Sequence, residues 1–538
     1  MLWLTVEGNV MHNEFDAVIV GSGINGLVAA SMLARSGWKV ALLESNPEIG
    51  GFVGSGERTV PGYVHDTFSS WYPLFVSGPA HTALGDDLAR HGLRFCNTDE
   101  AVTASVADSG RVTLAYRDPE LTAAGFGSEV DATAYLEALH RFGRNAPVIG
   151  GMMGSEIRSA GVVPLLARFF RTNGRRGSEK WLRDLAASGR AYCSREYVGP
   201  EVDHLWVPWL LHAGLSPDNA SGGFMIPVLA ATVHGFGLPV VEGGSARLLQ
   251  AFRGLLDELG VEVHTGSRVD RIIVEGGRAT GVETAGRRYR ARRAVLASVT
   301  PTALYGSLLP PEASPAPLRA QARRYRYGRG EMQIHIALSE SPKWRDTRLD
   351  EVPLVHISDG SASTGIARAE AEAGLLPRKP TVVVGQQSLL DPSRVPSGAA
   401  SLWLQLQEVP YEPLGDAAGE LNTADGWTPE LAKAYAQRVI DRVDAHTHGL
   451  KILGTDVISP ADLAAYNENA VGGDPYGGSS ELDQSFLWRP LPEAGRHRTC
   501  VDGLWHIGAS THPGAGLGAG SGHLVATKLA AQRQRKAN

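Results

Sequence analysis

The chain has 538 residues, a net charge of −6 and a hydrophobic share of 43%. These values are ordinary for a globular protein and give no electrostatic reason to expect nucleic acid as a partner. Because the length exceeds what one hydrophobic core usually serves, we expect two domains.

The cysteines and the N-terminus bear on location. Cys96, Cys193 and Cys500 are far apart and show no metal-ligand spacing, so we expect no metal site, no disulfide framework and a cytoplasmic protein. Residues 1–11 lack the features of a signal peptide, and no apolar run is long enough for a spanning helix.

A strand, a glycine turn and a helix are predicted near the N-terminus. Residues 15–20 form a short apolar run that indicates a buried strand, and the apolar stretch 27–36 predicts a helix. In the turn between them, the first glycine allows the tight bend and the second lets a pyrophosphate approach the backbone. The third lets the helix pack on the strand, and the helix start offers N–H groups to the anion. The residues assigned to this cradle are Gly21, Gly23, Ile24, Asn25 and Gly26.

A second strand is predicted over residues 39–43 and ends at an acidic residue. Glu44, next to Ser45, can accept hydrogen bonds from ribose hydroxyls, as expected about twenty residues after a dinucleotide-binding turn. The glycine pair Gly50–Gly51 follows directly. Such a pair lets the chain pass beside the ribityl and pyrophosphate of FAD, and a plain NAD dehydrogenase has no need of it. The sequence therefore predicts FAD as the cofactor.

From this point the sequence resembles the amine-oxidase and phytoene-desaturase group of FAD enzymes. The resemblance implies that residues 58–69 run beside the flavin ring, with Asp66 at an acidic position often found there. It also implies that Trp71 and Tyr72 face the substrate. For Asp66, hydrogen bonding at a strand end is the alternative interpretation.

Residues 99–118 alternate like strands, and residues 130–235 are predicted to be mainly helical. Within the helical region, residues 147–171 carry apolar side chains on a broad front and overlap a basic cluster at 168–176. Packing into a core is the favoured interpretation, and peripheral contact with a membrane stays open as the alternative.

The chain is expected to return to the cofactor domain over residues 239–300, through a helix, short strands and a buried strand at 294–298. The family resemblance implies that Val269 contacts the adenine through its backbone. Further strands at 332–338, 381–384 and 400–406 and a helix at 428–446 are assigned to the substrate domain. His335, on the first of these strands, is interpreted as a packed histidine rather than a catalyst.

Residues 467–489 contain two glycine pairs, which indicate unusual backbone or close approach to a ligand. Here the resemblance is closest to the pyridine nucleotide-disulfide oxidoreductase domain-containing protein 2 subgroup. It implies that the aromatic and Arg-Pro segment after this loop lines the flavin cavity. Trp488 is therefore expected to bind substrate, and Arg489 to act as a charge partner.

The C-terminal segment predicts a strand, a glycine-rich turn and a helix that runs to about residue 533. In the family this helix points at the pyrimidine edge of the flavin, where its dipole stabilises the negative charge of the reduced ring. The turn is desaturase-like, but Leu517 follows Gly516 where the family often has proline. The assigned cofactor contacts are Gly508, Ala509, Gly516 and Leu517, with His512 as a proton handler.

Together these features predict an α/β fold with a Rossmann-like FAD-binding domain and an interleaved α+β substrate domain. The first is expected to comprise residues 14–75, 239–300 and 495–538, and the second residues 76–238 and 301–494.

The predicted activity is an FAD-dependent oxidoreductase that transfers a hydride from a C–H bond of an apolar substrate to flavin N5. The substrate would be a polyene, a lipid or a natural-product intermediate, and the result desaturation or isomerisation. Asp66 and His512 are the candidate proton handlers, with Arg489 as their charge partner. Because no second dinucleotide turn follows, oxygen, a quinone or another flavin state is favoured over a nicotinamide as electron acceptor. The oligomeric state is left open.

Two alternatives remain at this point. One is a flavin amine oxidase or tailoring oxidase on the same fold. The other is a prenyl-binding escort of the GDP-dissociation-inhibitor type, which shares the fold but has lost FAD. The intact glycines of both turns argue against the escort.

Overall fold

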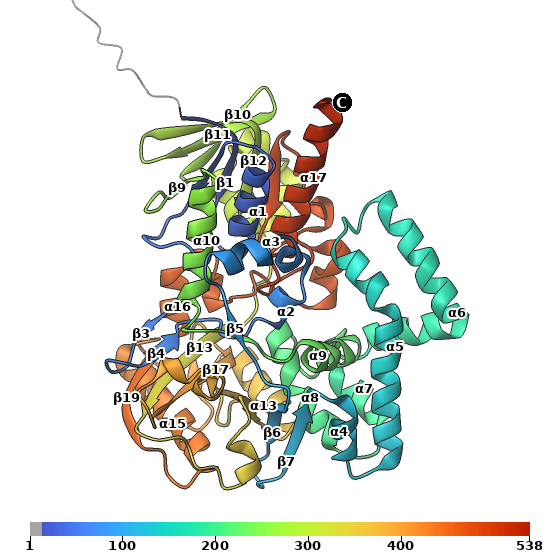
Figure 1. Cartoon of the computed structure of the whole chain (residues 1–538), viewed down its shortest axis with the longest axis vertical. Coiled ribbons are helices and arrows are strands. Elements are labelled where there is room, and N and C mark those ends of the chain that lie inside the picture. The colour runs from blue at the N-terminus through green and yellow to red at the C-terminus, as the bar shows by residue number, and fades with distance from the viewer. Residues whose placement is uncertain (1–12, 538) are drawn as a thin grey trace, which may run out of the picture.

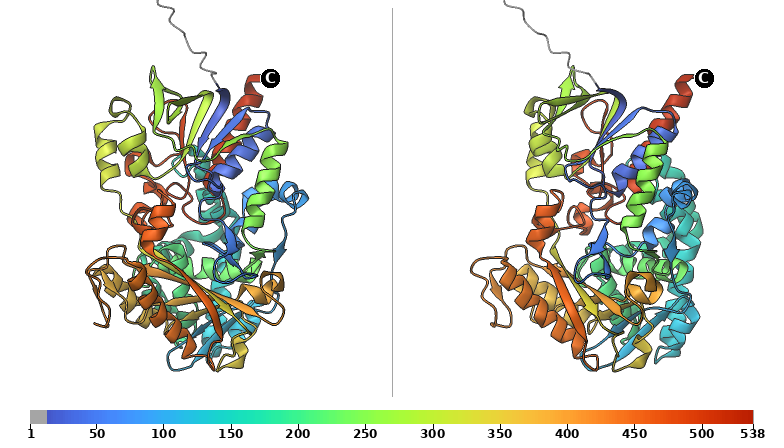
Figure 2. Two further views of the ribbon diagram at one scale, coloured as in Figure 1. Left: turned by 90° about the vertical axis from the view of Figure 1, so that its left-hand side faces the viewer. Right: turned by 60° about the vertical axis from the view of Figure 1, so that its left-hand side comes forward.

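The computed structural model describes residues 13–537. The N-terminal residues from which a signal peptide was judged absent lie outside that range. Figure 1 and Figure 2 show two sheets toward opposite ends of the long axis, with the chain crossing repeatedly between them and a pair of long helices at one side.

The first sheet has seven strands, of which β9, β2, β1, β12 and β20 run parallel in that order. β10 and β11 extend it as antiparallel strands beside β12. Since parallel strands end at one edge, β1 and β2 place the glycine turn and Glu44 side by side. The bounds are β1 Asn13–Val20, β2 Val40–Leu43, β9 Glu262–His264, β10 Arg271–Glu275, β11 Arg278–Thr284, β12 Arg287–Ser298 and β20 Leu504–Ile507.

Four helices share a hydrophobic core with one face of this sheet. They are α1 (Ile24–Arg35), α3 (Pro79–Arg90), α10 (Ala246–Glu258) and α17 (Gly520–Ala537). The opposite face packs against the π-helical turn Leu304–Leu308, which directly follows α11 (Pro301–Ala303), and against α12 (Ala316–Arg323). The expected boundaries put α3 and α12 in the substrate domain. They pack with the first sheet instead, because Leu84 and Leu318 are buried in its two cores.

The second sheet has the strand order β19-β13-β17-β16-β14-β6-β7. Every residue of the two long strands β13 and β17 is buried, and α15 covers the core beside them. The strands and the helix expected here are confirmed. Their bounds are β6 Ala101–Val106, β7 Val112–Tyr116, β13 Gly330–Leu338, β14 Leu354–Ile357, β16 Val382–Gly385, β17 Ala400–Val409, α15 Pro429–Asp444 and β19 Ile452–Ile458.

The region expected to be helical is helical. It comprises α5 Glu129–Met153, α6 Val163–Ala186, α7 Gly189–Glu196, α8 Glu201–Trp206 and α9 Gly222–Phe236. α5 and α6 form the arm at the right of Figure 1, and α6 is kinked at Gly174. Within residues 13–537, no helix combines the length and the apolar character needed to cross a membrane.

Shorter elements connect these layers. The hairpin of β3 and β4 precedes α2, and β5 pairs with β8 where the chain passes between the sheets. The bounds are β3 Ser55–Glu57, β4 Val64–Asp66, α2 Pro73–Val76, β5 Phe95–Cys96, α4 Pro119–Ala124, β8 Val240–Val241, α13 Ser361–Glu372, β15 Leu375–Leu376, α14 Gln387–Leu390, β18 Gly415–Asp416 and α16 Pro460–Tyr466.

Candidate active site

A cavity of about 310 Å³ joins the glycine turns of the first sheet to the buried strands of the second. One end is formed largely by backbone, at residues 23–25, 50–51, 508–510 and 515–517. The other end is formed by side chains from β13, β17 and the helical region.

The three glycines of the first turn do different work. Gly21 has a φ of +90°, which favours glycine. A Cβ atom on Gly26 would lie 2.0 Å from the carbonyl oxygen of Gly21, so no side chain fits there. Gly23 has an ordinary φ of −58° and no described atom within 4 Å of its Cβ position, and it lines the cavity. The first glycine is thus required by its backbone conformation and the third by packing, whereas the second faces open space.

The second turn lies directly against the first. Gly50 and Gly51 have φ values of +127° and +59°, and Gly50 forms a parallel bridge with Gly23. The Ser22 hydroxyl accepts a hydrogen bond from the Gly50 N–H (3.2 Å) and donates one to Glu44 (2.6 Å). Ser22, which sequence reasoning missed, therefore links both turns to the acidic residue.

The Glu44 carboxylate is nearly buried at the end of β2. It accepts hydrogen bonds from the Ser22 N–H (2.9 Å), the Ser45 hydroxyl (3.1 Å) and the Asn46 N–H (2.9 Å). The Ser267 N–H donates to the Glu44 carbonyl (2.7 Å), which brings the segment leading to Val269 alongside. Val269 buries its side chain against the first sheet, and its adenine contact stays a prediction.

The C-terminal turn closes this end of the cavity. Gly508 and Gly516 have φ values of +105° and +117° and line the cavity together with Ala509 and Leu517. The Asn25 side-chain oxygen accepts hydrogen bonds from the Ser521 hydroxyl (2.9 Å) and the Gly522 N–H (3.1 Å). These bonds hold the N-terminal ends of α1 and α17 side by side.

These residues fit FAD. The N-terminus of α1 has no side-chain cap, so its first N–H groups are available to an anion such as a pyrophosphate. Three glycine segments leave the backbone bare around that point, and Glu44 lies at the strand end where ribose hydroxyls are bound in this kind of fold. The residues that would hold the cofactor are those of the two N-terminal turns, Glu44 and the C-terminal turn.

The other end of the cavity is apolar and aromatic. Trp71, Trp209 and Trp403 line it with Leu229 and Val233. Trp71 thus lines the cavity, and its contact with the substrate stays a prediction. Tyr72 does not line the cavity: its side chain is fully buried in the core of the first sheet, next to Phe95.

Several polar residues at this end were missed by sequence reasoning. They are His212, Glu331, Gln405, Gln407 and Tyr476. The sequence did contain a signal for three of them, because Glu331, Gln405 and Gln407 interrupt strands whose other residues are mostly apolar.

His212 approaches His356 with 2.9 Å between their Nε2 atoms, and burial lowers the pKa of His212 to about 3. Burial also lowers the pKa of His356 well below its ordinary value, so both imidazoles are neutral at physiological pH, one donating and one accepting.

Asp66 lies outside the cavity lining, and its carboxylate is engaged on both oxygens. One oxygen forms an ion pair with the Arg394 guanidinium (2.7 Å) and accepts a hydrogen bond from the Ser70 hydroxyl. The other accepts from the Ser245 N–H (2.7 Å). This geometry favours a structural role over proton transfer. His335, whose Nε2 lies 2.9 Å from the Asp66 carbonyl, is packed as expected.

His512 is also absent from the cavity lining. Its Nε2 lies 3.1 Å from the Met152 carbonyl, at the end of α5, and burial lowers its pKa to about 4. The ring is therefore neutral and donates to that carbonyl. This contact joins the C-terminal turn to the helical arm and does not require a proton-transfer role.

Arg489 does not line the cavity, but its side chain fixes the backbone that does. Its guanidinium donates to the carbonyls of Ala509 (2.8 Å), Tyr476 (3.0 Å) and Ser479 (3.1 Å), and the first two residues line the cavity. It is a positioning residue rather than a partner of Asp66 or His512.

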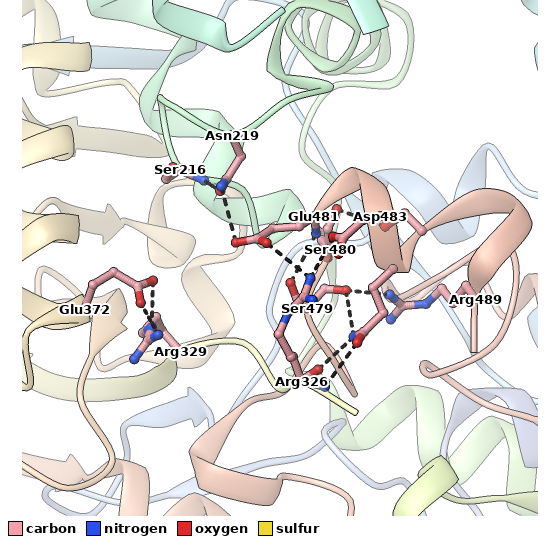
Figure 3. Close-up of polar contacts among 12 residues, drawn as sticks. Ser216, Asn219, Arg326, Arg329, Glu372, Ser479, Ser480, Glu481, Asp483 and Arg489 are labelled. Carbon is pink, nitrogen blue, oxygen red and sulfur yellow. Dashed lines mark hydrogen bonds and ion pairs between the residues drawn. The ribbon is translucent and has the colours of Figure 1, made fainter. Parts of the chain in front are cut away.

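Trp488 is 39% exposed and borders a shallow surface hollow with Glu481, so it lies away from the substrate end. Figure 3 shows Arg489 on one side of the loop that contains Ser479 and Glu481. The ion pairs of Arg326 with Glu481 and Asp483 lie beside it.

Comparison with known proteins shows which family the chain resembles in sequence and in fold. The rat pyridine nucleotide-disulfide oxidoreductase domain-containing protein 2 (Rattus norvegicus) is 25% identical, covering 97% of this chain and 96% of its own length. The zeta-carotene-forming phytoene desaturase of Myxococcus xanthus is 24% identical, covering 93% and 90%. Among solved structures, cyclohexylamine oxidase from Brevibacterium oxydans has the same fold, with a TM-score of 0.57 at 16% identity over 97% of this chain and 100% of that one. The model of the flavin containing amine oxidoreductase family matches residues 24–451, well over half of the sequence. The chain therefore belongs to this family and is an FAD-dependent oxidoreductase.

Proposed function

We propose that this enzyme takes a hydride from a C–H bond of an apolar substrate. Loss of a proton from the neighbouring carbon then completes a desaturation, whereas return of the hydride to another carbon completes an isomerisation. The observation that carries the proposal is the cavity itself, which runs without interruption from the glycine turns to a wall of tryptophan and aliphatic side chains. FAD, when bound, supplies the acceptor for the hydride that leaves the substrate. The similarity to a phytoene desaturase supports an extended apolar substrate.

The chain's own residues bind, orient and exclude water. Trp71, Trp209 and Trp403 provide flat apolar surfaces that fix the substrate's orientation and keep the reacting bond dry. α17 begins at Gly520, three residues after Leu517 in the cavity lining, so the positive end of its dipole lies at this end of the cavity and can stabilise negative charge there. Arg489 keeps the intervening carbonyls in place.

Amine oxidation is the second candidate. Three indole rings at one end of a cavity can also bind a cationic or nascent amine through their faces. The escort alternative has no support, because the family match and the intact glycine turns identify an oxidoreductase.

The test is anaerobic mixing of the FAD-loaded protein with polyenes, unsaturated lipids and amines, followed by absorbance near 450 nm. Bleaching by a polyene or lipid is the expected result. Bleaching by amines alone would overturn the proposed substrate class in favour of the second candidate. Purified protein that takes up no FAD would overturn both.

We further propose that the helical arm touches a membrane surface and so gives access to apolar substrates. Val163, Leu166 and Phe170 lie on one face of α6 and are 62%, 49% and 57% exposed. Arg168 and Arg171 are exposed beside them, and no acidic residue occurs between 157 and 178. Exposed apolar side chains rimmed by arginines match an anionic lipid surface.

The contact can be tested by flotation with vesicles that contain phosphatidylglycerol. The double substitution Leu166→Ser, Phe170→Ser should reduce vesicle binding about fivefold or more. Leu414→Ser, at a 77% exposed leucine elsewhere, is the matched control and should leave binding unchanged. Equal binding by all three proteins would overturn the arm's role.

A further inference from the structure

A cluster of buried polar groups lies at the otherwise apolar end of the cavity. Glu331 comes from β13, and Gln405 and Gln407 come from the adjacent strand β17. All three line the cavity, and each is more than nine-tenths buried. The Gln405 amide donates to one oxygen of Glu331 (2.6 Å), and the Gln407 amide donates to the Tyr476 hydroxyl (3.1 Å). The Tyr476 hydroxyl in turn donates to the Leu211 carbonyl (2.9 Å).

Two side-chain oxygens of this cluster do not take part in these hydrogen bonds. By hydrogen-bond geometry, the second carboxyl oxygen of Glu331 and the side-chain oxygen of Gln407 have no partner among the described residues. The Tyr476 hydroxyl, which donates to Leu211, lies close enough to the Glu331 carboxyl to lower its pKa, but less than burial raises it. A buried polar atom without a partner is costly, and native structures contain few of them. Both atoms belong to residues that line the cavity, so a bound ligand is the natural source of the missing hydrogen bonds.

The charge state of the cluster limits which chemical groups of a ligand can bind to it. Burial raises the pKa of Glu331 to about 8, so at neutral pH it is mostly an uncharged carboxylic acid that both donates and accepts. Among the described residues that line the cavity there is no lysine or arginine, and His212 is neutral. A group that also donates and accepts without carrying charge complements this set, and a hydroxyl group is the simplest.

We propose that Glu331 and Gln407, braced by Gln405, bind a hydroxyl group carried by an otherwise apolar substrate. This inference rests on the proposed function and deepens it, because it separates hydroxylated substrates from plain hydrocarbons. A hydrocarbon in the same cavity would leave both oxygens unpaired. Sites built to hydrogen-bond a substrate hydroxyl discriminate strongly against the analogue that lacks it.

The experiment uses FAD-loaded enzyme and three ligands on one skeleton: geraniol, geranylamine and the parent hydrocarbon. Dissociation constants come from perturbation of the oxidised flavin spectrum, and anaerobic bleaching is recorded separately. Geraniol should bind at least about tenfold more tightly than the hydrocarbon. Glu331→Met and Gln407→Leu should each reduce that ratio to about one by weakening geraniol alone.

Glu408→Gln is the matched control. Glu408 is a fully buried carboxyl on the same strand as Gln407, but it accepts a hydrogen bond from the Thr381 N–H (2.9 Å) and does not line the cavity. This variant should keep the wild-type ratio. If Glu331→Met fails to retain FAD, Glu331→Gln and Gln407→Leu carry the test.

The outcomes separate the inference from the proposed function. Equal affinity for geraniol and the hydrocarbon, or a Glu331-dependent preference for the amine, would overturn the hydroxyl site and leave the hydride chemistry standing. Binding that prefers geraniol without bleaching by any apolar compound would support the site and count against the proposed function.

Discussion

The two ends of the cavity are built in different ways. The cofactor end is made of main chain: glycines at positive φ, bare N–H groups at a helix start and one acid at a strand end. The substrate end is made of side chains that reach in from strands and helices far apart in the sequence. A site made of backbone requires particular residues at fixed spacings, whereas a site made of side chains only requires that a fold bring them together.

The sharpest way to test the cofactor end is to compare two glycines of one turn. Gly26→Ala places a Cβ atom on the Gly21 carbonyl and should cost more than about 4 kcal/mol of folding free energy. Gly23→Ala meets no described atom, so the apoprotein should keep its melting temperature while FAD affinity falls about 100-fold or more. Thermal unfolding and flavin titration give both quantities. Normal FAD binding by Gly23→Ala would mean that the cofactor's phosphates do not pass this turn.

This contrast explains what the sequence could predict. The strands, the helical region and the cofactor turns were predictable because periodicity and glycine spacing are local properties. The substrate end was not, since Trp209, Trp403 and Glu331 are more than 70 residues apart and share no motif. Asp66 and Tyr72 were assigned from the family resemblance of the segment that contains them. Sequence alone could not show that Arg394 engages the first or that Phe95 packs against the second.

A second test concerns Asp66, which sequence reasoning assigned to catalysis. Its partner Arg394 is buried, so Asp66→Ala leaves an incompletely paired charge and should lower the folding free energy by about 3 kcal/mol. Folded variant protein should still be bleached at a rate within about threefold of the wild type, because Asp66 does not line the cavity.

Arg394→Met and the double variant complete a mutant cycle in urea. A double variant less destabilised than the sum of the single ones would show the coupling expected of an ion pair. Asp66→Asn that keeps full stability but loses bleaching would instead restore the catalytic assignment.

A third test uses the pH dependence of stability to compare Glu331, in the cavity, with Glu408, outside it. Burial raises the pKa of Glu331 to about 8 and that of Glu408 to about 7, both from an ordinary value of 4.5. The folded protein therefore holds more protons at these two sites than the unfolded chain, so their contribution to stability is lost as pH rises. Each Glu→Gln variant should flatten this fall between pH 5 and pH 8, by roughly 3 to 4 kcal/mol at Glu331 and roughly 2 to 3 kcal/mol at Glu408.

The readout is urea unfolding of apoprotein at a series of pH values. Buried histidines act in the opposite direction and serve as an internal check. Burial lowers the pKa of His506 and His512 to about 4, so their contribution to stability rises with pH between about 4 and the ordinary value of 6.5. A wild-type fall above pH 6.5 that both glutamine variants retain would contradict the assignment to these carboxyls.

The smallest effect is expected at Trp488, and it separates the two tryptophans to which a substrate role was assigned. Trp71 lines the cavity, whereas Trp488 is 39% exposed beside a surface hollow. Trp488→Ala should change the folding free energy by less than about 0.5 kcal/mol and leave anaerobic bleaching within twofold of the wild type. Trp71→Ala, the matched change inside the cavity, should slow bleaching about tenfold or more, because a large apolar contact with the substrate is lost. If the two substitutions have the same effect, the side-chain end of the cavity does not bind the substrate, and the contrast between the two ends fails.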